Sequence, residues 1–348
     1  MTDGWICPAP LRNYERITIG HGGGGRLGAD LIEHLFLPAF GAAALDATPT
    51  DAAVTAVGEH RLAFTTDSYV VSPLFFPGGS IGELAVHGTI NDLAMAGAQP
   101  LALSTAFVLE EGLPLATLER IARAMGVAAS AAGARLLTGD TKVVGAGNAD
   151  GCYITTTGIG LVPPGVDIRP ERATPGDRIV LSGPIGLHGM AVMCVREGLE
   201  FDSDLCSDTA PLNGLVAALL AAGIDVHTMR DLTRGGMATA LCELAEVAGV
   251  GMTYDDAAVP VPEQVRAACG FLGLDPAAVA NEGRFVALVA PEDADLAVEV
   301  LQRHPAGTGA TVIGEVTDQH PGVVAARTPL GAQRVVDRPL GEQLPRIC

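Results

Sequence analysis

Residues 82–97 read Gly-Glu-Leu-Ala-Val-His-Gly-Thr-Ile-Asn-Asp-Leu-Ala-Met-Ala-Gly, and this stretch organises the first half of the chain. Its apolar stripe at helical spacing consists of Leu84, Ala85, Gly88, Leu93 and Ala96. The spacing predicts a helix that Gly97 ends. Runs on either side of it, at 61–66 and 101–109, have the character of strands. We therefore expect a helix that packs on a sheet.

Similar elements continue along the rest of the chain. Further strands are predicted at 51–57, 136–144 and 153–161, and a helix at 115–132. After a segment rich in Pro and Gly, a second series predicts strands at 178–182, 285–289 and 311–316, and helices at 189–197, 212–222, 237–248 and 294–303. We expect an α+β protein of two domains, at 17–165 and 175–325. A leader is expected at 1–16 and a flexible tail at 331–348.

The composition argues against several classes of protein. The 348 residues carry a net charge of −19, which disfavours binding to nucleic acid or to anionic membranes. The seven cysteines are scattered without a CxxC pair, as is typical of a reducing compartment. The first twenty residues lack a secretory signal, and the most apolar run, 215–224, is too short to span a bilayer. We expect a cytoplasmic protein.

The last eight residues, Gly-Glu-Gln-Leu-Pro-Arg-Ile-Cys, end the chain on a thiol. Pro345 lacks an N–H and disfavours helix in the residue before it, so the segment is expected to be extended and mobile. Prenylation motifs place their cysteine upstream of the chain end, which excludes a lipid anchor of that type. From the tail alone, Cys348 is equally a reactive group or the incidental last residue of a disordered end.

A short β-like run at 17–19 is followed by Gly22, Gly23, Gly24 and Gly25. A helical pattern comes after them, at 27–36. Glycines expose backbone N–H groups and adopt positive φ readily, so the run can wrap an anion. The Gly-Lys-Ser/Thr of a Walker A loop does not follow. A flap that covers phosphate groups and a flexible loop without function both remain open at this point.

Aspartates stand at the ends of apolar runs in the first half. They are Asp67, Asp92 and Asp140, with Thr66, Asn91 and Thr138 close by. Carboxylates that converge from separate segments are the ligands by which Mg²⁺ is held against ATP phosphates. Each aspartate alone is more often a cap or turn residue. Because all of them have hydroxyl or amide neighbours, the set favours a metal site.

Charged residues elsewhere allow two interpretations each. Lys142 is either a cation aimed at phosphate or an oxyanion, or a solvated lysine. In Asp-Leu-Thr-Arg-Gly-Gly, residues 231–236, Arg234 and Gly235 either meet a ligand or belong to a helix cap. Glu282 is a candidate general base if it is partly buried, and otherwise a turn carboxylate.

Taken together, these motifs resemble the HypE family of hydrogenase-maturation carbamoyl dehydratases, in the aminoimidazole ribonucleotide (AIR) synthetase, or PurM-like, superfamily. The residues that carry the resemblance are His21–Gly25, Thr66–Val71, Pro73–Gly78, Asn91–Met95, Thr138–Val143, Asp231–Gly236, Asn281–Gly283 and Pro345–Cys348. The similarity covers nearly the whole chain, and the terminal Pro-Arg-Ile-Cys is specific to the HypE branch. Leu187 departs from the family pattern, in which Asp usually precedes His188-Gly189.

The resemblance implies a fold and a reaction. The two-domain PurM-like fold would form a homodimer in which the N-terminal halves build a β-barrel-like core, with ATP near the interface. A carbamoyltransferase, HypF, would place a carbamoyl group on Cys348, and the protein would use ATP to dehydrate it to a thiocyanate. The cyanide would then pass to iron on a HypC–HypD scaffold, for the [NiFe]-hydrogenase centre.

The resemblance also implies roles for residues. Mg²⁺ would be held by Asp67, Asp92 and Asp140. ATP would be bound by these aspartates, the glycines at 22–25, Asn91, Thr138, Arg234 and Gly235. Lys142 would stabilise charge, and Glu282 would take protons from the carboxamide nitrogen carried by Cys348. A carrier that only holds the group on its thiol is the alternative of a different class, and ATP hydrolysis distinguishes the two.

Overall fold

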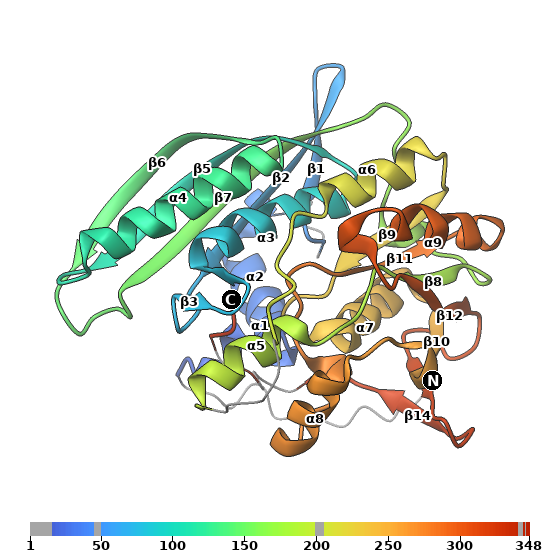
Figure 1. The fold of residues 1–348 in the computed structure, drawn as a ribbon. Coiled ribbons are helices and arrows are strands. Elements are labelled where there is room, and N and C mark those ends of the chain that lie inside the picture. The colour runs from blue at the N-terminus through green and yellow to red at the C-terminus, as the bar shows by residue number, and fades with distance from the viewer. Residues whose placement is uncertain (1–15, 45–49, 199–204, 340–343, 345) are drawn as a thin grey trace.

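The computed structural model describes residues 16–44, 50–198, 205–339, 344 and 346–348. The expected leader, apart from its last residue, and part of the expected tail lie outside the described residues. Two sheets with their helices lie side by side and share a buried boundary (Figure 1).

The first sheet has the strand order β1-β2-β7-β5-β6. Its strands are β1 (Ala53–Val57), β2 (His60–Tyr69), β5 (Gln99–Glu110), β6 (Arg135–Val144) and β7 (Cys152–Val162). All neighbours are antiparallel except β5 and β6, which are parallel because helix α4 (Leu115–Ala131) connects them. The short strands β3 (Phe75–Phe76) and β4 (Gly79–Ser80) form a separate hairpin. The hairpin predicted for 51–66 is confirmed, and its second strand continues through Asp67.

Helix α3 (Ile81–Met95) lies at the centre of the molecule, between the first sheet and the second domain. The predicted helix at 82–96 is therefore confirmed to within one residue. Its first turn is capped by the Ser80 hydroxyl, which accepts a hydrogen bond from the Gly82 N–H at 3.1 Å. Only Glu83 and Asp92 along this helix are not buried. Asp92 is thus one of two residues on an otherwise buried helix that keep some exposure, and it accepts a hydrogen bond from the Thr65 hydroxyl at 2.6 Å.

The second sheet has the order β14-β13-β10-β12-β8-β11-β9. Its strands are β8 (Arg178–Leu181), β9 (Val226–Asp231), β10 (Gly251–Asp255), β11 (Phe285–Val289), β12 (Thr311–Thr317), β13 (Val324–Arg327) and β14 (Gln333–Val336). Helix α7 (Gly236–Ala248) packs on one face, and α6 (Asn213–Ala221) and α9 (Ala294–Gln302) pack on the other. Strand β14 lies within the stretch that the sequence assigns to the tail, because β13 offers it a paired edge.

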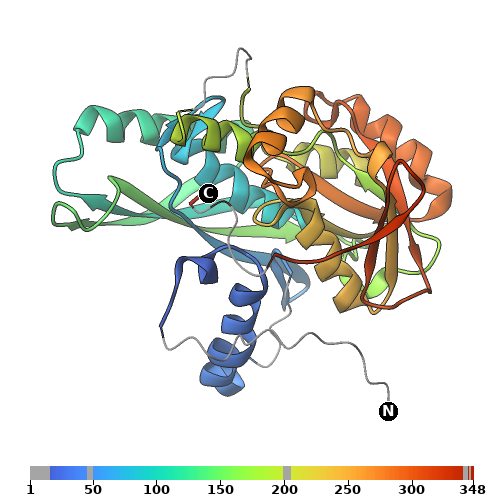
Figure 2. The same ribbon diagram turned by 90° about the horizontal axis from the view of Figure 1, so that it is seen from below.

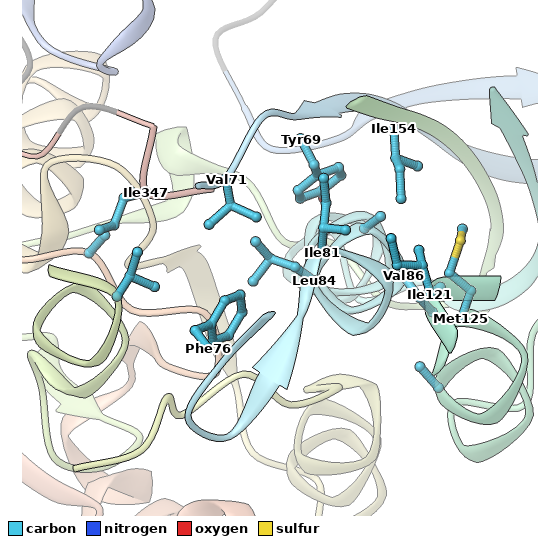
Figure 3. Close-up of a cluster of buried hydrophobic side chains, with 14 of the residues drawn as sticks. Tyr69, Val71, Phe76, Ile81, Leu84, Val86, Ile121, Met125, Ile154 and Ile347 are labelled. Carbon is cyan, nitrogen blue, oxygen red and sulfur yellow. The ribbon is translucent and has the colours of Figure 1, made fainter. Parts of the chain in front are cut away.

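The two domains share one continuous core (Figure 3). It combines α3 and α4 with α5 (Leu187–Arg196) and α8 (Glu263–Leu272) of the second domain. Ile347, at 2% exposure, inserts from the C-terminal end beside Val71 and Leu84. The last residues are therefore part of the boundary between the domains.

The N-terminal segment differs from its prediction. The β-like run at 17–19 does not form a strand, since a 3₁₀ helix, η2, spans Ile19–Gly22. A helical run follows, composed of α1 (Arg26–Leu31), η3 (Ile32–Phe36), α2 (Leu37–Phe40) and η4 (Gly41–Ala44). It lies on the side of the first sheet opposite α4 (Figure 2).

The run Arg26–Ala44 is, among the described residues, the one helix that is long and apolar enough to cross a membrane by length and composition. The sequence pattern predicts a helix at 27–36, but the run is not one uninterrupted apolar stretch, so it is not expected to span a bilayer. Asp30 and Glu33 lie within the run, and Pro38 interrupts its backbone hydrogen bonding. A single helix of this kind is weak evidence for a membrane span.

Asn91 joins the domains through its side chain. Its Nδ2 donates to the carbonyl oxygens of Ala210 and Glu282, each at 3.1 Å, and its Oδ1 accepts from the Leu212 N–H at 2.8 Å. Asn91→Ala is expected to lower the free energy of unfolding by about 3 kcal/mol, because buried backbone groups lose their partners. Urea unfolding measures this, with the exposed Asn148→Ala as control. Equal stability of the two variants would contradict the role of Asn91.

Candidate active site between the domains

Three carboxylates from separate elements meet where the domains join. Asp51 precedes β1, Asp92 lies on α3, and Asp231 ends β9. Their ligand oxygens all lie within 4.8 Å of one another. We call Asp51, Asp92 and Asp231 the acid cluster. Asp67, on β2, faces the same region. It lies two residues from the buried Thr65 and from the buried Tyr69, so all of them point to the helix side of the sheet.

Burial and mutual repulsion raise the pKa values of these groups. Burial is the largest cause that raises the pKa of Asp92 well above its ordinary value, and repulsion from Asp67 adds to it. The pKa of Asp231 is raised in the same way, chiefly by burial and then by Asp51. Burial raises the pKa of Asp51 to about 6, although Arg230 opposes the shift. One Asp231 oxygen, Oδ2, is buried without a hydrogen-bond partner in the described part of the chain.

Two arginines of the second domain balance this negative charge. Arg230 lies 3.0 Å from Asp51 Oδ1 and 2.6 Å from Glu243 Oε2. Arg234 comes shortly after Asp231 in the sequence. The negative charge of Cys348 is the largest influence that raises the pKa of Arg234. Attraction to Asp67 and Glu282 raises the pKa of Arg234 further. Acidic groups from the chain end, from β2 and from the loop that carries Glu282 thus all act electrostatically on Arg234.

The glycine run packs against Arg234. The Arg234 Nη1 donates to the Gly22 carbonyl at 3.1 Å. Gly24 has a φ of 69°, and a Cβ added there would lie 2.7 Å from the Arg234 Cβ. Gly235 has a φ of 78°, and a Cβ there would lie 2.1 Å from the Thr239 hydroxyl. Both positions therefore require glycine, and the structure brings the predicted glycine loop and Arg234-Gly235 together.

Glu282 is 2% exposed, and its Oε1 has no hydrogen-bond partner within the described residues. Burial is the largest cause that raises its pKa well above the usual value, followed by repulsion from Asp231 and Asp208. A buried carboxyl without a partner, near a cation, has the environment of a general base. The alternative of an ordinary turn carboxylate does not fit its burial.

Some predicted site residues do not join this group within one chain. Asp140 and Lys142 lie on β6, an edge strand that the helices leave exposed, and they pair with each other at 2.6 Å. The hydrogen bond from Lys142 lowers the pKa of Asp140. Thr138 is exposed on the same strand. Asp140 is predicted as a third ligand because it follows an apolar run, whereas the structure places Asp51 and Asp231 beside Asp92.

The end of the chain is docked in this region. The Val70 N–H donates to the Cys348 carbonyl at 3.0 Å, and the Ser72 N–H donates to the Arg346 carbonyl at 3.3 Å. Leu344 and Ile347 are buried in the core shared by the domains. The described part of the tail is therefore packed, where the sequence suggested an extended, mobile segment.

Comparison with known proteins places this geometry in a family. Residues 49–162 match the N-terminal domain, and residues 174–326 the C-terminal domain, of AIR synthase related proteins. The chain is 54% identical over 334 residues to carbamoyl dehydratase HypE of Rhizobium leguminosarum bv. viciae, covering 96% of this chain and 95% of that protein. It is 43% identical over 338 residues to carbamoyl dehydratase HypE of Escherichia coli K12, covering 96% of this chain and 100% of that protein.

Solved structures point to the same family as the sequence relatives do. The chain is similar to a crystal structure of a HypE–HypF complex, with a TM-score of 0.82, 44% identity, and coverage of 89% of this chain and 99% of that one. It is equally similar to HypE in complex with ATP, with a TM-score of 0.81, 45% identity, and coverage of 94% and 98%. The two-domain PurM-like fold expected from the sequence is confirmed, and the chain belongs to the HypE family of carbamoyl dehydratases.

Proposed function

We propose that this enzyme uses ATP to dehydrate a carbamoyl group on its own Cys348 to a thiocyanate, which supplies cyanide for the iron centre of [NiFe]-hydrogenase. The observation that carries the proposal is the docking of Cys348 at the boundary between the domains, where the Val70 backbone holds it and it packs against the shared core. A relative solved with ATP and others named carbamoyl dehydratase support it.

The chemistry explains why ATP is required. An amide oxygen is a poor leaving group, so the γ-phosphoryl group of ATP is transferred to it and ADP departs. Two protons then leave the nitrogen side as the C–O bond breaks, which gives R–S–C≡N and phosphate. The sum is R–S–CO–NH₂ + ATP → R–S–CN + ADP + phosphate + H⁺. Phosphoryl transfer of this kind depends on positioning and on charge neutralisation.

The residues of the site divide this work. Glu282 accepts a proton from the carboxamide nitrogen, since it is a buried carboxyl without a partner in the described region. Arg234, with Gly235 and the glycines at 22–25, encloses the phosphates. Asn91 contributes through position, because its side chain is occupied by backbone groups of the second domain.

A divalent cation fits the acid cluster. The ligand atoms that the acid cluster offers are all carboxylate oxygens, which Mg²⁺ prefers. One of them, Asp231 Oδ2, is buried without a hydrogen-bond partner among the described residues. We propose that Asp92, Asp51 and Asp231, with Asp67 nearby, hold Mg²⁺. The ion would neutralise charge on the ATP phosphates.

We further propose HypF as the donor of the carbamoyl group, the HypC–HypD complex as the acceptor of the cyanide, and the cytoplasm as the compartment. A relative was solved in a HypE–HypF complex. The scattered cysteines and the negative charge of the chain agree with a cytoplasmic protein.

We propose a homodimer that pairs the outward faces of the first sheets. By strand register, the large exposed apolar side chains on this outward face include Val57, Phe64, Val108 and Ile159. Exposed apolar residues gathered on one sheet are typical of an interface between subunits. Asp140, Lys142 and Thr138 lie on the edge strand of this sheet, so we assign them to the ATP site of the partner subunit.

Mixing two inactive variants tests this arrangement. In a heterodimer of the two variants, the Lys142→Ala subunit keeps its Glu282 and the Glu282→Gln subunit keeps its Lys142. One of the two sites therefore combines an intact Glu282 with an intact Lys142 from the other subunit, and the second site has neither. Random exchange of subunits should therefore restore about a quarter of the wild-type activity. The measurement is single-turnover dehydration after refolding the mixture, with each variant alone as control. No recovery would place Lys142 and Glu282 in the same subunit's site, or exclude the dimer.

The intact mass of the C-terminal peptide tests the function itself. After carbamoylation by the transferase, Mg²⁺-ATP should remove one water from the peptide that contains Cys348. Cys348→Ala and a non-hydrolysable ATP analogue are the controls. A carbamoylated peptide that persists while ATP is not consumed would instead favour a carrier without catalytic activity.

A further inference from the structure

The last three residues extend the edge of the N-terminal domain. Arg346 and Cys348 accept from the backbone N–H groups of Ser72 and Val70, in the pattern of an added antiparallel strand. Two backbone hydrogen bonds alone hold a chain end weakly. The carbonyl of Ile347, between them, points away from this edge toward the second domain, where His188 meets it.

His188 is fully buried on α5, and its Nε2 lies 2.8 Å from the Ile347 carbonyl oxygen. A carbonyl can only accept, so Nε2 carries the proton. Nδ1 lies 2.8 Å from the Ser207 hydroxyl, which fixes the orientation of the ring. The Phe76 ring packs edge-on against it, with centroids 5.4 Å apart. A buried imidazole held on three sides thus presents one donor to the chain end.

Two arginines complete this contact. Arg196, about two turns further along α5, donates to the Ser72 carbonyl at 2.7 Å and to the Arg346 carbonyl at 2.6 Å. It therefore ties together the two strands that pair. The Arg346 side chain forms an ion pair with Asp150 at 2.6 Å, and Arg346 has a φ of 55°. That backbone conformation is unfavourable for a residue other than glycine, so side-chain contacts must hold it.

We propose that His188, assisted by Arg196, is a positioning residue that latches the chain end and so holds Cys348 in its docked place between the domains. The evidence for the latch is the pair of contacts that His188 and Arg196 make with the carbonyls of Ile347 and Arg346. Its part in the reaction rests on the function proposed above.

Alkylation of Cys348 by iodoacetamide tests the latch without any assumption about the reaction. His188→Leu should increase the alkylation rate of Cys348 about tenfold, because a buried carbonyl loses its donor and the docked state loses occupancy. His188→Gln, which retains an N–H donor, should return the rate toward that of wild type. His60→Leu, at the exposed first residue of β2, is the matched control.

Other cysteines of the chain provide internal references. The exposed Cys206 gives the rate of an accessible thiol, and the buried Cys152 and Cys269 report whether the fold is intact. Equal Cys348 rates in wild type and His188→Leu, with the buried thiols protected, would overturn the latch. If the buried thiols of His188→Leu react, Arg196→Gln makes the same test from the surface side of the contact.

Single-turnover dehydration then tests the role in the reaction. His188→Leu should slow the loss of water about tenfold at an unchanged KM for ATP, while HypF carbamoylates the variant at least as fast as wild type. Slower carbamoylation with normal dehydration would overturn the positioning role. Wild-type protein that fails to dehydrate would refute the proposed function, and the alkylation result would still decide on the latch.

Discussion

Glu282→Gln is expected to lower the single-turnover rate of dehydration about a thousandfold, the effect of removing a general base. Gln has the shape of Glu but cannot accept a proton from the carboxamide nitrogen. The buried Glu282 carboxyl has an oxygen without a partner in the described part of the chain, so that oxygen is available to the substrate. The measurement is quenched-flow mass analysis of the carbamoylated C-terminal peptide at saturating Mg²⁺-ATP.

The pH dependence gives this prediction a second readout. A base must be ionised to act, and burial with acidic neighbours raises the pKa of Glu282 well above 4.5. The wild-type rate should therefore rise with pH at higher pH than an ordinary glutamate would give, and Glu282→Gln should lose that dependence. Glu263→Gln, in the exposed first turn of α8, should change neither. A variant at position 282 that keeps both rate and pH profile would remove Glu282 from the mechanism.

The same carboxyl should cost stability. A group whose folded-state pKa is raised stabilises the fold at low pH, and that contribution is lost as the pH rises through the folded-state value. Above that pH the ionised Glu282 is buried at a cost that Gln does not have. Glu282→Gln should thus have a higher Tm than wild type at pH 8, and the difference should vanish near pH 4.5, which differential scanning calorimetry can follow. Higher stability with lost activity is expected of a group retained for chemistry.

Much of the fold could be predicted from local patterns. The helix at 81–95 and the hairpin of β1 and β2 have strong periodicity and turn signals, and both form where expected. The strand expected at 17–19 is wrong, because a run this short has no periodicity that distinguishes a strand from a helical turn. Strand β14 was assigned to the tail because its pairing depends on β13, a partner that local sequence does not reveal.

The candidate site divides in the same way. Glu282, Arg234 and Asp92 were found from motifs, and the structure brings them to the boundary between the domains. Asp51 is not predicted as a ligand, because the sequence pattern makes it the first residue of a strand at 51–57. Only the fold brings it within reach of Asp92 and Asp231. The packing of the chain end could not be predicted either, since its partners lie more than a hundred residues away in the sequence. They are the backbone N–H groups of Val70 and Ser72 and the side chains of His188 and Arg196.

Asp92→Asn is expected to abolish the stabilisation of the protein by Mg²⁺ and to lower dehydration at least a hundredfold. Without a cation, burial and repulsion raise the pKa of Asp51 to about 6 and that of Asp92 well above its ordinary value. Their contribution to stability is present at low pH and is lost as the pH rises through these values. Tm in EDTA should therefore fall from pH 5 to pH 8.

Mg²⁺ should reverse that fall, because a cation binds the ionised carboxylates of the folded protein and stabilises it by about 2.7 kcal/mol at a hundred times its Kd. The reversal should be greatest at pH 8, where protons no longer compete for the acid cluster. Asp92→Asn removes one charge and one ligand, so its Tm should depend little on Mg²⁺, whereas the exposed Asp318→Asn should behave as wild type. If Mg²⁺ stabilised Asp92→Asn as much as wild type, the ion would bind elsewhere, and the buried carboxylates of the acid cluster would need another explanation.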